Sequence, residues 1–179
     1  MASELAARDA SFTHNRTGIY GTMFIAAAIS CAQVMKDKEE IIRTALKYVP
    51  QESRFFIRSK ICLDEILRAS DWEDGYKKIN NILNEYGHCR IYQEVGLMIN
   101  SFLFANNIYE GICIQVSQGA DTDSFGASVG SLLGSYYGPE GLDSKWLEIF
   151  NDDIHTGMAW FFERSVSKLA KRMGRLPVN

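Results

Sequence analysis

The chain has 179 residues with a formal net charge of −3, and 46% of its residues are hydrophobic. This length is enough for one domain with a buried core, so we expect a single domain over residues 1–179. The slightly negative charge argues against nucleic acid as a partner, because binding to nucleic acid needs a basic surface.

The N-terminus and the cysteines predict a cytoplasmic protein. Residues 1–16 carry charged side chains and no apolar core, so they do not form a signal peptide. The cysteines are widely spaced and form no CxxC pair, which predicts free, buried thiols in a reducing cytosol. The four are Cys31, Cys62, Cys89 and Cys113. The three histidines show no ligand spacing that would predict zinc.

One uncharged segment, Thr17–Met35, approaches the roughly 20 residues that a membrane-spanning helix needs. Its glycine, hydroxyl and amide side chains and its many alanines weaken it as a membrane span. We expect instead a helix buried on all sides in a helical bundle, and no membrane partner.

Long periodic segments and only three prolines predict an all-α protein. The expected helices are Glu4–Ala10, Gly18–Met35, one from Asp37 to before Pro50, Ser53–Ala69, Asp71–Tyr86, Tyr92–Phe104, Ile108–Ser117, and one after Ser124. Gly87 is a candidate for the C′ position after the fifth of these. The basic residues between Arg164 and Arg175 predict a solvated last helix whose cations suit the negative end of its dipole.

The stretch Gln118–Ser124 (QGADTDS) places two carboxylates and a hydroxyl within four positions. On one continuous helix Asp121 and Asp123 would point about 200° apart, so they can converge only if Gly119–Thr122 is a loop with Asp123 near the N-cap. Converging hard oxygens suit Mg²⁺ or Mn²⁺. On spacing alone, an ordinary aspartate cap is the more common explanation of such a stretch.

The helix that follows carries glycine at every fourth position, at residues 126, 130, 134 and 138. Each glycine lowers helix stability by about 1 kcal/mol relative to alanine. We therefore expect this stripe to permit the close approach of another helix backbone, which would hold the start of the helix rigidly.

Two segments together resemble the ADP-ribosylglycohydrolase family. Gln118–Ser124, the small-residue helix through Gly138, and Lys145-Trp146 are similar to its C-terminal metal-binding segment. Asp9–Asn15 and Gly18–Gly21 are similar to a second family segment, in the same order and spacing. The resemblance extends from about Ala2 to Trp146.

The resemblance implies an orthogonal all-α bundle that holds two Mg²⁺ or Mn²⁺ ions and hydrolyses the glycosidic bond between ADP-ribose and its acceptor. By this resemblance Asp121 and Asp123 are catalytic metal ligands, and Ser124 stands at a hydroxyl ligand position. His14 and Gly119 would contact the substrate, ADP-ribose or an ADP-ribosylated protein. The acceptor is not defined by these residues.

The family's other metal cluster, a Thr-Asp-Asp type run beside a Gly-rich phosphate loop, has no counterpart in this sequence. The chain therefore resembles the C-terminal half of a complete enzyme, as expected of a truncated, split or cleaved product. We expect the isolated chain to be inactive unless a companion N-terminal half supplies the other ligands. The alternative is a catalytically silent helical module that binds ADP-ribose or a protein partner, or that forms a homo-oligomer through its Phe161, Phe162, Val166 and Leu169 face.

Overall fold

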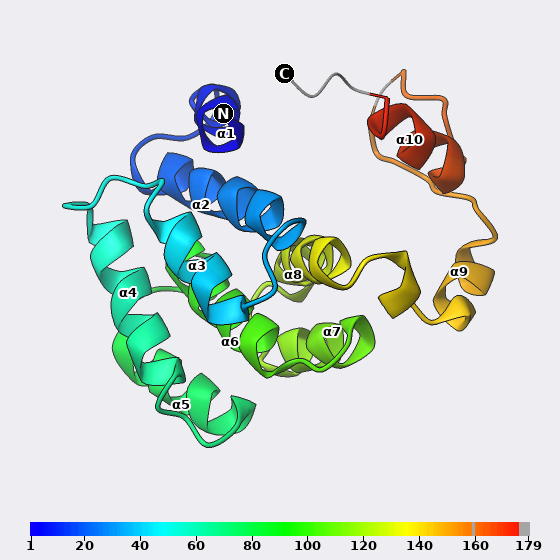
Figure 1. The fold of residues 1–179 in the computed structure, drawn as a ribbon. Helices are drawn as coiled ribbons and strands as arrows, with labels where there is room; N and C mark the ends of the chain where they lie inside the picture. The colour runs from blue at the N-terminus through cyan, green and yellow to red at the C-terminus, as the bar shows by residue number, and fades with distance from the viewer. Residues whose placement is uncertain (159, 176–179) are drawn as a thin grey trace. The chain divides into compact units, whose positions relative to one another are not determined.

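The computed structural model describes residues 1–158 and 160–175, and these residues form ten α-helices, a short 3₁₀ turn and no strand. The all-α prediction is therefore confirmed. The chain divides into two compact units, Met1–Gly141 and Leu142–Asn179. The first unit contains α1 (Ala2–Ala10), α2 (Thr17–Ala32), α3 (Lys38–Leu46), α4 (Arg54–Ile66), α5 (Trp72–Leu83), α6 (Ile91–Phe104), α7 (Ile108–Ser117), α8 (Thr122–Tyr137) and η1 (Pro139–Gly141). Figure 1 shows their succession along the chain.

Several of these helices begin at capping residues that the sequence supplies. The side chains of Asp37, Ser53, Asp71 and Asn107 each accept a hydrogen bond from the backbone N–H three residues later. Such caps satisfy a backbone donor that the helix itself leaves unpaired. The starts of α3, α4, α5 and α7 are consequently fixed by local chemistry.

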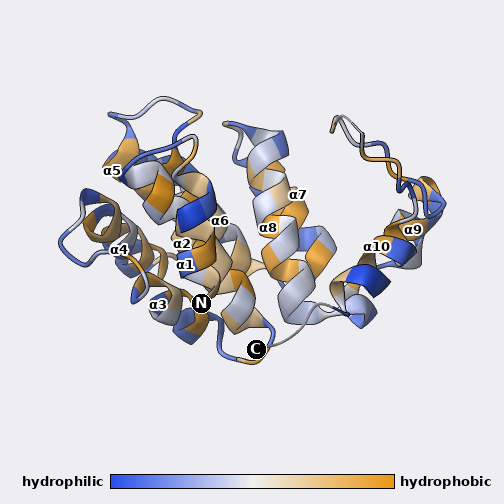
Figure 2. Cartoon of the chain, turned by 90° about the horizontal axis from the view of Figure 1, so that it is seen from above, coloured by the Kyte–Doolittle hydropathy of each residue, from blue (hydrophilic) through white to orange (hydrophobic). Residues whose placement is uncertain are grey.

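Helix α6 forms the centre of the first unit. Every residue from Val95 to Phe102 is buried, and α6 contacts α2, α3, α4, α5, α7 and α8. Apolar colours accordingly prevail along α6 in Figure 2. By contrast α2 buries only part of its surface, with Gly21, Phe24 and Ala28 facing inward and most other positions half-buried. The expectation that this helix is buried on all sides was wrong, and α6 takes that position instead.

A lysine is enclosed by aromatic rings at the end of this core. The Lys38 ammonium lies 5.4–5.5 Å from the ring centroids of Phe102, Tyr136 and Tyr137. It also donates to the carbonyl oxygen of Ala105. Cation–π attraction and this hydrogen bond attach the start of α3 to the ends of α6 and α8.

The glycine stripe of α8 does not permit a close helix approach, contrary to expectation. A Cβ built on Gly126 or Gly130 would lie 3.8 and 3.9 Å from the nearest side-chain atoms of α7, which is ordinary contact. Nothing lies within 4 Å of a Cβ on Gly134, and Gly138 ends the helix with a φ of 72°. The crowded glycine of this helix pair is Gly111 of α7, where a Cβ would stand 2.3 Å from Leu133 Cδ1.

Two smaller expectations were also wrong. Helix α5 ends at Leu83 with Asn84 as its C-cap, so Gly87 lies beyond the cap and outside the helix. All four cysteines are free, but only Cys62 is buried and Cys89 is exposed.

The second unit contains α9 (Ser144–Phe150) and α10 (Val166–Met173), with an antiparallel bridge between Asp153 and Ser165. The Asp152 carboxylate accepts hydrogen bonds from the Ser165 hydroxyl and from the Ser167 backbone and hydroxyl. Helix α10 has Lys171 and Arg172 in its last turn, as predicted for a solvated terminal helix. Within the part of the chain that the structure describes, no helix is both long and apolar enough to cross a membrane.

Candidate active site

The acidic stretch forms a left-handed turn that leads into α8. Gly119 and Ala120 have φ values of 75° and 65°, and Asp121 is the N-cap of the helix that begins at Thr122. The prediction of Asp123 near the N-cap was therefore displaced by two residues. The Asp121 side chain accepts no capping hydrogen bond from the backbone of α8.

The predicted ligands are close neighbours in sequence at the start of α8. Asp121 is the N-cap of that helix, and Asp123 and Ser124 lie in its first turn. The Cys89 thiol donates to Asp121 Oδ2 over 3.0 Å. That contact, followed by those with Asp123 and Ser124 and by the field of His88, lowers the pKa of Asp121 against the effect of desolvation. Asp121 is therefore held in the ionised form that metal ligation requires.

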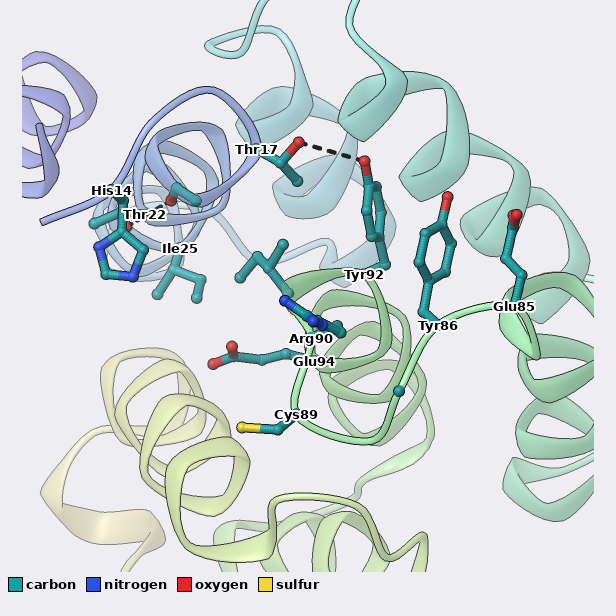
Figure 3. Close-up of a pocket in the computed structure, with 13 residues that line it drawn as sticks. His14, Thr17, Thr22, Ile25, Glu85, Tyr86, Cys89, Arg90, Tyr92 and Glu94 are labelled. Carbon is teal, nitrogen blue, oxygen red and sulfur yellow. Dashed lines mark hydrogen bonds between the residues drawn. The ribbon is translucent and has the colours of Figure 1, made fainter.

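A cleft of about 760 Å³ lies on the other side of Cys89. Its walls come from the start of α2, the loop between α5 and α6, and the first turn of α6. Figure 3 shows Cys89, Arg90 and Glu94 extending from the start of α6 towards α2 and α8. Cys89 thus lines the cleft and also contacts Asp121.

His14 lies at this cleft. Its side chain is exposed, its Nδ1 is 2.8 Å from the Thr13 hydroxyl, and its ring packs over Gly18. A Cβ on Gly18 would come within 2.8 Å of the His14 ring, so a glycine is needed there for the ring to lie in this position. The structure places His14 among the residues that line the cleft, whereas Gly119, Asp121, Asp123 and Ser124 lie outside that lining.

The cleft contains polar groups that the sequence analysis did not identify. Glu94 is half-buried, and its Oε1 accepts a hydrogen bond from the Ser128 hydroxyl of α8 at 2.9 Å. Burial raises the pKa of Glu94, and the negative charge of Asp121 raises it further. Tyr86 and Tyr92 stack with ring centroids 4.2 Å apart, and the Tyr92 hydroxyl lies 3.3 Å from Thr17 Oγ1. No motif marks these residues, because they come together only when α2, α6 and α8 pack.

The donor set fits a divalent cation in kind but not in number. Carboxylate and hydroxyl oxygens are the ligands that Mg²⁺ and Mn²⁺ prefer. Among the described residues, however, no group of three or more histidine, cysteine, aspartate or glutamate side chains is arranged to hold a metal ion. The described residues therefore form no complete site for a metal ion.

Fold and site together describe an all-α protein with a carboxylate-bearing helix start beside a polar cleft. Comparison with known families agrees with this description, since the profile of the family described as ADP-ribosylglycohydrolase matches residues 1–175. The chain belongs to the ADP-ribosylglycohydrolase family. No curated protein and no solved structure matched the chain.

Proposed function

We propose that this chain is part of a metal-dependent hydrolase that cleaves the glycosidic bond between ADP-ribose and its acceptor. The observation that carries the proposal is the position of Asp121, Asp123 and Ser124 at the start of one helix, in a chain that matches the family over residues 1–175. We further propose one all-α domain over residues 1–179, acting in the cytoplasm, where its cysteines would stay free.

Asp121 and Asp123 would bind the cation directly, and Ser124 would bind it more weakly or orient one of the two carboxylates. His14 would contact the ribose or a phosphate from the cleft, and Gly119 would allow the substrate to approach the turn. Two Mg²⁺ or Mn²⁺ ions, when bound, would orient the ribose hydroxyls and activate a water for attack at the anomeric carbon.

The remaining ligands are proposed to come from elsewhere, because the described residues contain no group of three or more histidine, cysteine, aspartate or glutamate side chains that could hold a metal ion. A companion N-terminal half or a second copy of the chain could carry them. We therefore expect the isolated chain to bind Mg²⁺ weakly and to release no ADP-ribose. Calorimetry that showed tight, stoichiometric Mg²⁺ binding to the chain alone would contradict this expectation.

The direct test substitutes one ligand in a protein that holds both metal clusters. Asp123→Ala should abolish Mg²⁺-dependent release of ADP-ribose while the far-ultraviolet circular dichroism stays unchanged. Glu140→Ala is the matched control, because Glu140 is an exposed carboxylate just past the opposite end of α8. Unchanged turnover in Asp123→Ala would remove Asp123 from the mechanism.

A silent binding module is the second candidate. Phe162, which is 81% exposed, and Val166, which is 42% exposed, favour it, because uncovered apolar side chains promote association. A thermal midpoint that rises with ADP-ribose only when Mg²⁺ is present supports the hydrolase. An equal rise of the thermal midpoint with ADP-ribose in the presence and absence of Mg²⁺ supports the binding module.

A further inference from the structure

A network of buried polar side chains joins α6 to the end of α7, which comes just before the turn that carries Asp121. Asn100, Ser101 and Gln115 are fully buried, and Gln118 is 3% exposed. Polar groups are costly to bury unless they are hydrogen-bonded, so four of them in one place require a structural or functional reason. The proposed function assigns none of them a role.

Gln118 connects this network to the turn. It is the C-cap of α7 and immediately precedes Gly119. Its Oε1 accepts from Asn100 Nδ2 over 2.8 Å, and its Nε2 donates to Ser101 Oγ over 2.7 Å and towards the Leu97 carbonyl oxygen over 3.4 Å. All three partners belong to α6, the most buried helix of the protein. The last residue before the turn is thereby fixed to the core.

The turn itself is not a conformation that its residues would adopt freely. Ala120 has a φ of 65°, a left-handed geometry that a residue with a Cβ rarely occupies. Such a residue persists only where its surroundings determine it. On the far side, the Asp121 carbonyl oxygen accepts from the backbone N–H of Phe125, whose side chain is buried. Gln118 and Phe125 therefore hold the turn from both ends.

We propose that Gln118 is a positioning residue whose amide, anchored on α6, sets the direction in which the Asp121 carboxylate points. This inference rests on the proposed function only in taking Asp121 as a cation ligand. Its structural content is separate, namely that Gln118 orders Gly119 and Ala120. Gln115 offers the matched comparison, because it lies in the same network but inside α7, where its Oε1 is 2.9 Å from Ser101 Oγ and it does not adjoin the turn.

The test compares Gln118→Met with Gln115→Met, since methionine has nearly the same shape as glutamine and lacks its hydrogen bonds. Both variants should lower the thermal midpoint by similar amounts. Only Gln118→Met should lower the backbone order parameters of residues 119–121, from about 0.85 to below about 0.6. The same variant should weaken Mn²⁺ binding, followed by water-proton relaxation, by about tenfold. Equal effects of the two variants, or no effect of either, would overturn the proposal.

A double variant separates positioning from general stability. Adding Ala120→Gly to Gln118→Met relieves the left-handed alanine and should restore part of the thermal midpoint, while Mn²⁺ binding stays weak. Recovery of Mn²⁺ binding together with stability would show that Gln118 acts through stability alone. If Gln118→Met does not fold, the shorter amide in Gln118→Asn provides the same comparison with fewer lost contacts.

Asp121→Asn keeps this inference distinct from the proposed function. If that variant and the unaltered chain bind Mn²⁺ equally, the assignment of Asp121 as a ligand fails. The order parameters of residues 119–121 then decide the role of Gln118 without reference to any metal.

Discussion

The Cys89 thiol donates a hydrogen bond to Asp121 Oδ2 over 3.0 Å and so joins the segment before α6 to the turn before α8. Each partner changes the other in the expected sense: the pKa of Asp121 is lowered and that of Cys89 is raised. The contact places a neutral donor beside the carboxylate that we propose as a ligand. It can be tested without metal or substrate.

We predict that Cys89→Ala raises the pKa of Asp121, because the first cause of its lowered value is lost. Cys89→Ser is the control, since its hydroxyl can still donate. A carboxyl group whose pKa is lowered by folding adds stability above its unfolded value, near 3.9, and this stability disappears as the pH falls through the folded value. Cys89→Ala should therefore lose less stability than the unaltered chain between neutral and acidic pH. Carbon NMR titration of Asp121 in the metal-free protein measures the shift, and an unchanged pKa in Cys89→Ala would refute the prediction.

Two glycines of the α7–α8 pair should respond oppositely to alanine. Gly111→Ala places a methyl group 2.3 Å from Leu133 Cδ1 and 2.9 Å from the Ala105 Cβ, so we expect a loss of about 1–3 kcal/mol from overpacking. Gly130→Ala meets only Ile112 Cδ1 at 3.9 Å and should stabilise the protein by up to about 1 kcal/mol through helix propensity. Urea unfolding measures both values. Destabilisation by Gly130→Ala would contradict this prediction and would indicate that another helix packs closely against the glycines of α8.

The buried thiol of Cys62 should make the protein sensitive to alkali. Burial raises its pKa from 9.0 to about 12, with a small opposing effect of Arg58. A group whose pKa is raised by folding contributes its full stability below the unfolded value and loses it as the pH rises towards the folded one. Between pH 9 and 12 the contribution of Cys62 should therefore fall by about 1.4 kcal/mol per pH unit at most.

Cys62→Ala isolates this effect from the tyrosines and lysines that titrate in the same range. The cavity left by alanine makes the variant less stable near neutral pH. Because alanine cannot ionise, the difference in unfolding free energy between the two proteins should shrink from pH 8 to pH 10.5. A constant difference would show that Cys62 does not ionise on unfolding in this range.

Local chemistry accounts for what could be predicted from the sequence. Helix α7 has its predicted bounds, Ile108–Ser117, and the structure shows that the side chain of Asn107 caps its start. The start of α8 was predicted near Asp123, whereas Asp121 is its N-cap. The left-handed backbone at Gly119 and Ala120 comes directly before this start, and an alanine gives no sign of that conformation in the sequence.

Tertiary packing decided the features that were missed. Gly75 and Gly111, where a Cβ would lie 2.1 and 2.3 Å from its nearest neighbour, are single glycines outside the α8 stripe. The regular stripe on α8 was conspicuous but has ordinary contacts. Glu94 entered the cleft because α6 brings it beside Ser128 of α8, a pairing across 34 positions that no local signal predicts.

The central position of α6 has a consequence for how the protein is made. The helices α2 to α5 all contact α6, yet α6 begins only at Ile91, after every one of them. A ribosome delivers the chain from its N-terminus, so these earlier helices emerge before the segment that covers their inner faces. Until residue 104 or so has been released, the nascent polypeptide carries uncovered apolar surface, and molecular chaperones that recognise such surface would meet it at this stage.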